Sequence, residues 1–357
     1  MSVYRDERRG TWYVQASYHD SHGARHRTTK RGFATRREAQ AWERDFVALH
    51  EGSLTMTLAG FWEVYAQDRK PRVRESTWLT KEAIVRDKIL PFFGDTPVCE
   101  ITPADVISWQ NELSSHRDPS GAPYSPTYLR TVETQLSAIL NHAVRYYGLA
   151  RNPVLAAGHI GRKNSEEMQF WSKDEYLRFS EAVMDKPDAW LAFEVLYWTG
   201  IREGELLALT PADFDLGRLR LSITKSYQRL AGHDHIGPPK TERSRRTIAI
   251  PRFLADEVAE HVALNHIPTD ARIFPVTKYF LLHEMQRGSS TAGVKRIRVH
   301  DLRHSHVSLL IQMGFNVLAI ADRLGHESID ITYRYAHLLP DGQGEMADRL
   351  EAEGGTR

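Results

Sequence analysis

Two arginines stand inside otherwise apolar helical segments in the second half of the chain, and they restrict its fold more than any other feature. Arg202 lies within the apolar run Tyr197–Leu209. Arg303 opens a helical pattern whose apolar residues are expected to be buried, namely Val307, Leu309 and Leu310. An isolated guanidinium is costly to bury unless an acidic group or a ligand accompanies it. The chain must therefore fold so that each arginine meets a partner, such as Glu205 for Arg202, or a bound anion.

Length and composition indicate an ordinary globular protein with more than one domain. A chain of 357 residues is expected to form two or three compact units, each with its own apolar core. No apolar run is long enough to span a bilayer, so we expect no membrane partner. The net charge is only +1, but residues 1–50 hold ten Lys or Arg against six Asp or Glu. Any binding of nucleic acid must therefore depend on local basic patches.

Cysteine usage and the first residues bear on the cell compartment. Cys99 is the only cysteine, so neither an intrachain disulfide nor a cysteine-based zinc site can form. The first ten residues contain no apolar run of the signal-peptide kind. We therefore expect a reducing cytoplasm.

The segment 1–52 is expected to form a small α+β domain, a three-stranded sheet backed by one helix. Alternating residues predict strands at Thr11–Ser17 and Arg25–Phe33, and Thr35 with Glu38 forms a capping box for the helix that follows. Such a basic sheet can lie in a DNA groove with arginines near phosphates. The alternative is a charged sheet face exposed to solvent. The candidate DNA-binding residues are Arg25, Arg27, Lys30 and Arg31.

From 56 to 160 the pattern predicts an all-helical domain. Ser76 is expected to begin a helix that Pro91 ends, and Thr102 and Ser125 are N-caps that each precede a proline. The polar stretch 161–167 is the expected linker. An ordinary charged helical surface would explain this segment equally well, so it indicates no function by itself.

The segment 166–340 is expected to be a mixed, mainly helical domain. Ser172, with Glu175 as its capping partner, begins it, and 219–226 and 245–251 are strand-like segments of a hairpin. The tail 341–357 is rich in Asp, Glu and Gly, and we expect it to be loosely held.

The chemistry of the third segment points to a phosphate diester. Arg303 lies three residues after His300, so the two side chains project from neighbouring turns of one helical face. Two guanidiniums suit the non-bridging oxygens of a phosphodiester, on which negative charge accumulates during transfer. Either arginine alone would more often belong to a structural ion pair.

Further motifs follow one another along this segment: Arg202 and Glu205 in TGIREGEL, Lys240 in PPKTERSRRTIAI, His300 and Arg303 in HDLRH, His326 in LGH and Tyr335 in TYRYAH. Taken together, these residues resemble the tyrosine recombinase (phage integrase) family. The order of the motifs agrees with the family, as do the gaps of three residues from His300 to Arg303 and nine from His326 to Tyr335. The first two segments resemble the family's arm-binding and core-binding domains more loosely.

The resemblance implies a fold and a mechanism. The third domain would have the DNA breaking-rejoining fold, and Tyr335 would attack the scissile phosphate to give a 3′-phosphotyrosyl link. A phenol is mostly protonated at neutral pH and needs help to lose its proton, which His300 would provide. Lys240 would protonate the leaving 5′-oxygen. Arg202, Arg303 and His326 would hold the phosphate, with Glu205 supporting the arginines.

The resemblance also implies partners. We expect double-stranded DNA with attachment-type sites, a homotetramer in the synaptic complex and an accessory DNA-bending or excision factor. The location would be nucleoid-associated, in the cytoplasm of a bacterial host. One phosphodiester is exchanged for another, so neither ATP nor any other cofactor is expected. The task would be integration and excision of a mobile element.

Alternatives remain for two of these residues. Tyr333 is a rival nucleophile, but two residues apart on a helix it cannot face the same site as Tyr335. Lys225, on the preceding strand, could take the place of Lys240.

A metal site is also conceivable on the helix of Arg303. His300 and His304 have the i, i+4 spacing of a zinc-binding helix. Asp301, however, replaces the glutamate base of such motifs, and Arg303 would put a cation beside the metal. We therefore expect no metal, and we expect His304 and His306 to pack or to form hydrogen bonds.

Two other functions compete with recombination. A type IB topoisomerase-like enzyme would share the chemistry, but the arm-like first segment counts against it. A non-catalytic DNA-binding accessory protein would have lost catalytic side chains, whereas every matched position here carries a competent one.

Overall fold

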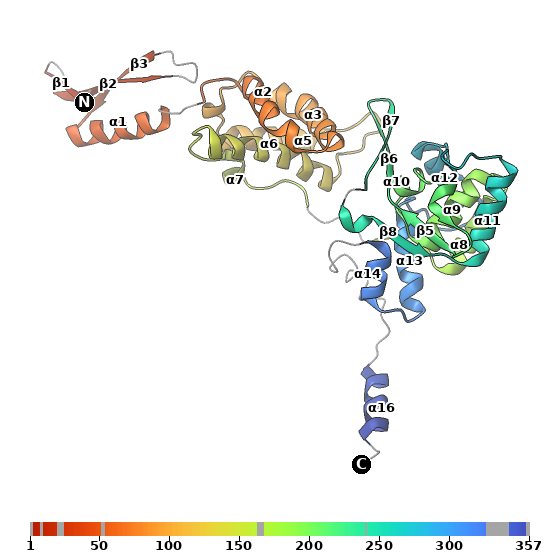
Figure 1. The fold of residues 1–357 in the computed structure, drawn as a ribbon. Helices are drawn as coiled ribbons and strands as arrows, with labels where there is room; N and C mark the ends of the chain where they lie inside the picture. The colour runs from red at the N-terminus through yellow and green to blue at the C-terminus, as the bar shows by residue number, and fades with distance from the viewer. Residues whose placement is uncertain are drawn as a thin grey trace. The chain divides into compact units, whose positions relative to one another are not determined.

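The chain forms two compact units, which divide between Glu166 and Glu167 (Figure 1). The computed structural model describes residues 3–7, 10–19, 25–50, 54–162, 168–239, 241–325 and 343–354. The first unit contains both the N-terminal sheet and the helical segment, so the predicted domain boundary near 52 stays a prediction. Most of the predicted linker, 163–167, lies outside the described residues.

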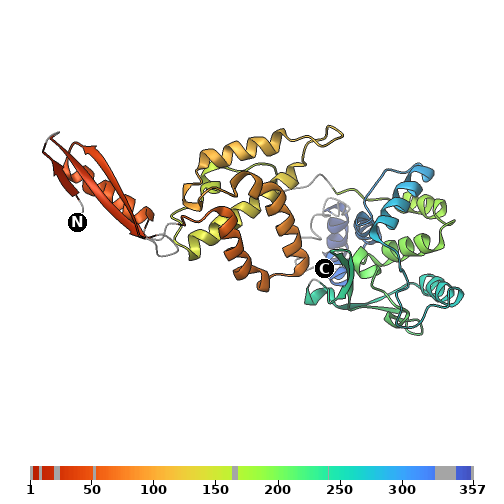
Figure 2. The ribbon, with the colours of Figure 1, turned by 90° about the horizontal axis from the view of Figure 1, so that it is seen from above.

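The N-terminal residues form the predicted three-stranded antiparallel sheet with one helix along a face (Figures 1 and 2). Thr35 caps that helix as expected, because its hydroxyl accepts from the Glu38 N–H at 3.2 Å and Glu38 accepts from Thr35 N–H at 3.3 Å. A β-bulge lies opposite Trp12 and Tyr13. The elements are β1 (Val3–Asp6), β2 (Thr11–His19), β3 (Arg25–Phe33) and α1 (Arg36–His50).

The second part of this unit is all-helical, as predicted. Thr102 and Ser125 cap helices that start with proline. Its core joins residues from all the longer helices, including the fully buried Phe61, Val132 and Leu136. The helices are α2 (Leu58–Arg69), α3 (Glu75–Ile84), α4 (Leu90–Phe93), α5 (Pro103–Ser115), α6 (Pro126–Tyr146) and α7 (Pro153–Ala157).

The expectation that Ser76 begins a helix and Pro91 ends it was wrong. The helix starts at Glu75 after Arg74, and it passes through a π-helical stretch, Val85–Ile89, into α4. The Leu90 N–H bonds five residues back to the Val85 carbonyl, so the wider turn re-forms the helix immediately before Pro91. Proline lacks an N–H, and it is tolerated here because it stands in the first turn of a new helical segment.

The second unit surrounds a nearly apolar helix with other helices and small sheets. Nine of the 13 residues of α9 (Pro187–Thr199) are buried, and α8 (Lys173–Ala182), α11 (Arg252–Leu264) and α13 (Asp301–Gln312) pack around it. Ser172 and Glu175 form the predicted capping box at the start of α8. The other helices are α10 (Glu203–Leu206), α12 (Lys278–Ala292) and α14 (Val317–Leu324).

The strands of this unit are more numerous than predicted. The two expected strands do pair, as β5 (Arg220–Ile223) with β8 (Arg246–Ala249), in a sheet of order β4-β5-β8 with β4 at Phe214–Asp215. Between β5 and β8 the chain forms a separate hairpin, β6 (Ser226–Leu230) and β7 (His233–Gly237). The tail, expected to be loosely held, contains the helix α16 (Gln343–Gly354). Among the described residues, no helix combines the length and the apolar character that crossing a membrane requires.

Gly288 lets α12 pack closely on α8, and replacing it tests this contact. A Cβ there would stand 2.4 Å from Val183 Cγ1 and 2.6 Å from Phe179 Cε2. We expect Gly288→Ala to lower the free energy of unfolding by about 1–3 kcal/mol from overpacking, although alanine is the better helix former by about 1 kcal/mol. Urea unfolding measures the change. The exposed neighbour Ser290→Ala is the control, and equal stability of the two variants would contradict the expectation.

Candidate active site

Arg202 stands at the junction between α9 and α10. Gly200 ends α9 in the left-handed conformation, and a Cβ there would approach His306 Cδ2 to 2.5 Å. The chain then turns at Arg202, whose N–H donates to Glu205 Oε2 at 2.9 Å, and the Arg202 Nη1 donates to Glu205 Oε1 at 2.8 Å. The ion pair that the sequence suggested is therefore present, yet 35% of the Arg202 side chain remains exposed.

Arg303 is held differently. It lies on α13 with only 4% of its surface exposed, and it donates to the Gly200 carbonyl and to the Leu324 carbonyl, both at 2.8 Å. Of the residues expected to be buried on this helix, Val307 is fully buried, whereas Leu309 and Leu310 are only partly buried. Arg303 thus links the end of α9 to the end of α14.

Three arginines converge on the last turn of α14. Arg246 Nε donates to the Arg323 carbonyl at 2.8 Å, Arg303 Nη2 to the Leu324 carbonyl at 2.8 Å and Arg202 Nη2 to the Gly325 carbonyl at 3.4 Å. The last carbonyls of a helix have no intrahelical partner and form the negative end of its dipole. Consecutive carbonyls of one helix end therefore gather three cations that lie far apart in the sequence.

Glu205 is the acidic group between two of these arginines. It is 1% exposed, and Arg246 Nη2 donates to its Oε2 at 3.0 Å while Arg202 occupies Oε1. Burial alone would raise the pKa of Glu205, but Arg246 and then Arg202 outweigh it and lower the pKa below the usual range. The carboxylate stays charged, as two adjacent guanidiniums require.

A cavity of about 240 Å³ opens beside Arg202 and His300. Its lining includes Glu203, Lys278 and Pro239, the residue before Lys240. His300 is exposed as a residue, yet partial loss of hydration and the nearby Arg303 guanidinium lower the pKa of its ring. The imidazole is therefore neutral at pH 7 and can accept a proton.

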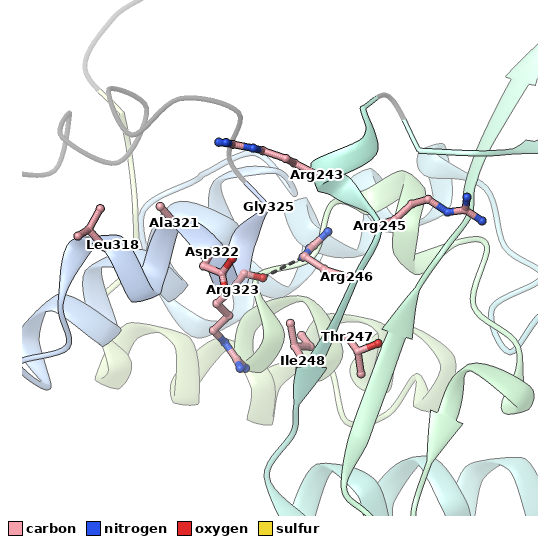
Figure 3. Close-up of a pocket in the computed structure, with 10 residues that line it drawn as sticks. All are labelled: Arg243, Arg245, Arg246, Thr247, Ile248, Leu318, Ala321, Asp322, Arg323 and Gly325. Atoms are coloured by element: carbon pink, nitrogen blue, oxygen red, sulfur yellow. Dashed lines mark hydrogen bonds between the residues drawn. The ribbon is translucent and has the colours of Figure 1, made fainter.

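A second cavity, of about 480 Å³, lies between the start of β8 and α14 (Figure 3). Arg243, Arg246 and Arg323 line it, and the bond from Arg246 to the Arg323 carbonyl crosses between the two elements. Arg245 points away from α14.

Some predicted site residues cannot be located. The structure brings Arg202, Glu205, His300 and Arg303 together, whereas Lys240, His326, Tyr335 and the rival Tyr333 lie outside the described residues. Lys225, the alternative to Lys240, has its ammonium 2.8 Å from Asp213 Oδ2 and 2.9 Å from Thr210 Oγ1. Lys225 is thus engaged by an acidic partner and a hydroxyl.

Sequence reasoning missed Arg246 and Arg323. Arg246 has the same parity along β8 as the buried Ile248 and Ile250, so alternation alone would have put it on the inner face. Arg323 Nε donates to His306 Nε2 at 3.2 Å, and His306 Nδ1 lies 2.8 Å from the Tyr197 carbonyl. Arg323 lies in the last turn of α14, a position that favours cations and was a usable signal.

The zinc alternative gains no third ligand among the described residues. The rings of His300 and His304 lie 5.5 Å apart, edge to face, and His304 Nε2 is 3.8 Å from Asp301 Oδ1. Within that same part of the chain, no cluster of three or more His, Cys, Asp or Glu could hold a metal ion. His306 packs and forms hydrogen bonds, as expected.

In the N-terminal sheet, the candidate DNA-binding residues fall on two faces. Val14 and Ala16 face α1, so Tyr13 lies on the opposite side, where Arg31 stands over its ring at 5.5 Å. Arg27 lies four residues before Arg31 on β3, so its side chain is on the same face of the sheet as that of Arg31. Lys30 lies on the helix side, its ammonium 5.2 Å from the Trp42 ring centre. The side chain of Arg25 is not among the described ones.

Comparison with known proteins gives the family. Three family models match: an arm DNA-binding domain over residues 2–48, the SAM-like N-terminal domain of phage integrases over 57–114, and the phage integrase family over 169–341. The integrase of Staphylococcus phage L54a is 30% identical over 266 residues, which are 64% of this chain and 75% of the phage protein. The chain belongs to the phage integrase family of tyrosine recombinases.

Other relatives support the same family membership. The ICEBs1 integrase of Bacillus subtilis (strain 168) is 29% identical over 304 residues, 80% of this chain and 78% of that protein. The fold is that of the Tn1549 transposon integrase in complex with a circular intermediate DNA, with a TM-score of 0.69 at 20% identity over 83% of this chain and 99% of that one. Lambda integrase, solved as a tetramer bound to a Holliday junction, gives a TM-score of 0.59 at 18% identity. The match covers 96% of this chain and 95% of the lambda integrase chain.

Family membership fixes the activity. This integrase is a site-specific DNA recombinase that cuts and rejoins strands through a phosphotyrosyl intermediate. The fold class is as predicted, with arm-binding, core-binding and catalytic parts. The relatives do not favour the topoisomerase-like or accessory-protein alternatives.

The buried His306 makes stability depend on pH. Burial and the Arg323 guanidinium lower the pKa of His306 to about 3, whereas an unfolded histidine titrates near 6.5. Between these values the unfolded chain binds the proton and the folded chain does not. The free energy of unfolding should therefore fall as the pH drops below about 6.5, by up to about 1.4 kcal/mol per pH unit for this residue.

Urea unfolding at pH 7.5, 6 and 5 measures this slope. His306→Asn should flatten it, because the titrating group is gone. The matched control is Val307→Ala, which removes buried atoms next to it without changing any proton binding and should keep the slope. An unchanged slope in His306→Asn would contradict the assignment.

Proposed function

We propose that the integrase inserts and excises a mobile element, with Tyr335 as its nucleophile. Arg202, Arg303 and His326 would hold the scissile phosphate, His300 would assist proton transfer, Lys240 would protonate the leaving 5′-oxygen and Glu205 would support the arginines. The observation that carries this proposal is the convergence of Arg202 and Arg303 on the end of α14, directly before His326.

The two arginines differ in what they can offer a phosphate. Arg202 is partly exposed at the 240 Å³ cavity, so its guanidinium can meet a non-bridging oxygen directly. Arg303 is nearly buried and bonds two carbonyls. Because its guanidinium is buried, its charge is screened less by water than that of Arg202, and it can still stabilise negative charge on a phosphate in the cavity. Phosphoryl transfer depends mainly on such positioning and charge.

His300 suits the role of a proton acceptor. It lines the same cavity as Arg202, and its lowered pKa keeps the ring neutral at pH 7. A neutral imidazole can take the phenol proton, whereas an imidazolium cannot. Pro239 lines this cavity too, so Lys240 is one residue away from it in the sequence.

The partners follow from the family. DNA is the substrate, and lambda integrase has been solved as a dimer bound to a core site and as a tetramer bound to a Holliday junction. For this chain we propose attachment-type sites, a homotetramer in the synaptic complex and an accessory DNA-bending or excision factor. Its substrate would place it in the cytoplasm of a bacterial host, at the nucleoid. The domains we propose are 1–52, 56–160 and 166–340, followed by the tail 341–357.

The nucleophile can be identified with a nicked suicide substrate, on which cleavage leaves the protein attached to the DNA. Tyr335→Phe should form no covalent adduct, because phenylalanine has no oxygen to attack phosphorus. Tyr333→Phe is the matched control and should form the adduct as the unmodified chain does. Denaturing gels measure the adduct, and an adduct with Tyr335→Phe would refute the assignment.

The face of the N-terminal sheet opposite α1 should contact arm-type DNA. Replacing both Arg27 and Arg31 with alanine removes two cations from that face, so the slope of log affinity against log salt should become shallower by about 2. Lys30→Ala removes one cation from the other face and should change the slope less than half as much. Fluorescence anisotropy on a duplex selected by the full chain measures both. Equal slopes for all three proteins would contradict a role for this face.

A further inference from the structure

We propose that Arg246 is a positioning residue of the recombination reaction, which fixes the orientation of Arg202 and the place where α14 ends. The proposal rests on the function assigned above, because it takes Arg202 as a group that contacts the scissile phosphate. Arg246 would not touch DNA itself. It would act through Glu205 and through the last turn of α14.

Arg246 bonds three segments of the described site at once. Its Nη2 donates to Glu205 Oε2 at 3.0 Å, its Nη1 to the Ser244 carbonyl at 2.9 Å and its Nε to the Arg323 carbonyl at 2.8 Å. Glu205 belongs to the Arg202 segment, Ser244 to the loop that follows Lys240, and Arg323 to the helix that precedes His326.

The contacts close into a ring with Arg202. Arg202 Nη1 donates both to Glu205 Oε1 at 2.8 Å and to Ser244 Oγ at 3.1 Å. Arg246 donates to the same carboxylate and to the carbonyl of the same serine. Glu205 is thus gripped from two sides, and its plane, which sets the direction of the Arg202 fork, depends on both arginines.

Burial makes the guanidinium hard to replace. Only 7% of the Arg246 side chain is exposed, and its stem lies against Gly325, where a Cβ would stand 3.2 Å from Arg246 Cδ and 2.6 Å from the Arg243 carbonyl. A lysine presents its three donors from a single nitrogen, so it could not reach acceptors spaced as widely as those that the three guanidinium nitrogens contact. The geometry of the fork, and not its charge alone, is therefore what the site uses.

The test compares, in the full chain, Arg246 at the start of β8 with Arg245 directly before that strand. Arg246→Lys keeps the charge and removes the fork, so the single-turnover cleavage rate at saturating suicide DNA should fall by at least about tenfold, because a misplaced phosphate ligand costs rate. The affinity for the same DNA should stay within about twofold. Arg245→Lys is the matched control: Arg245 is exposed and points away from α14, and its replacement should leave both quantities unchanged (Figure 3).

A pH profile separates positioning from general weakening of the fold. Arg246 is the largest influence that lowers the pKa of Glu205, ahead of Arg202. In Arg246→Gln the Glu205 carboxylate should protonate at a higher pH. When the pH is lowered, cleavage should therefore be lost earlier, at a higher pH, than in Arg245→Gln. This variant keeps one donor, and it also serves if Arg246→Lys does not fold, which its thermal unfolding would reveal.

The outcomes distinguish this inference from the proposed function. Equal cleavage rates in the two lysine variants, or equal pH profiles in the two glutamine variants, would overturn the role of Arg246. The unmodified chain and Tyr335→Phe are run alongside. If the first forms the DNA adduct and the second does not, the proposed function stands whatever Arg246 does.

Discussion

The site depends on how a few buried cations are neutralised. Arg202, Arg246 and Arg303 all approach the end of α14, and a guanidinium inside a protein is stable only where acceptors surround it. The acceptors are one carboxylate, Glu205, together with the carbonyls of residues 323–325, the Gly200 carbonyl and two oxygens of Ser244. Without them the same arginines would repel each other. The catalytic unit is therefore assembled around acceptors as much as around the arginines that the chemistry uses.

This arrangement also explains why the site draws on segments far apart in the chain. Helix ends and loops have unpaired carbonyls, whereas the middle of a helix or strand has none to spare. The apolar α9 ends at Gly200, whose carbonyl accepts from Arg303, and α14 ends at Leu324. The core around α9 holds the first end in place, and a smaller cluster that packs α14 on α13 holds the second, so packing in the interior determines the geometry at the surface.

Much of this could be predicted from the sequence. The predicted N-caps at Thr35, Thr102 and Ser172 marked helix starts correctly, because side-chain caps are local chemistry. The pairing of Arg202 with Glu205 was equally local. Arg246 was missed because its partners lie 41 residues before it and 77 after it. The β6-β7 hairpin was missed as well, because neither strand has an alternating apolar pattern and β7 is largely exposed. The prediction that a helix ends at Pro91 was wrong because the π-helical stretch before the proline depends on packing, which local sequence does not reveal.

The π-helical stretch Val85–Ile89 limits how the all-helical part of the first unit can change in evolution. Each residue added to a helix rotates everything after it by about 100°. Loss of one residue here would therefore swing the buried Phe93 away from Trp109, whose ring centre lies 5.6 Å from its own. Substitutions that keep the stretch apolar on its inner side would be absorbed, whereas a change of length would not. The segment thus has a fixed length but a permissive composition.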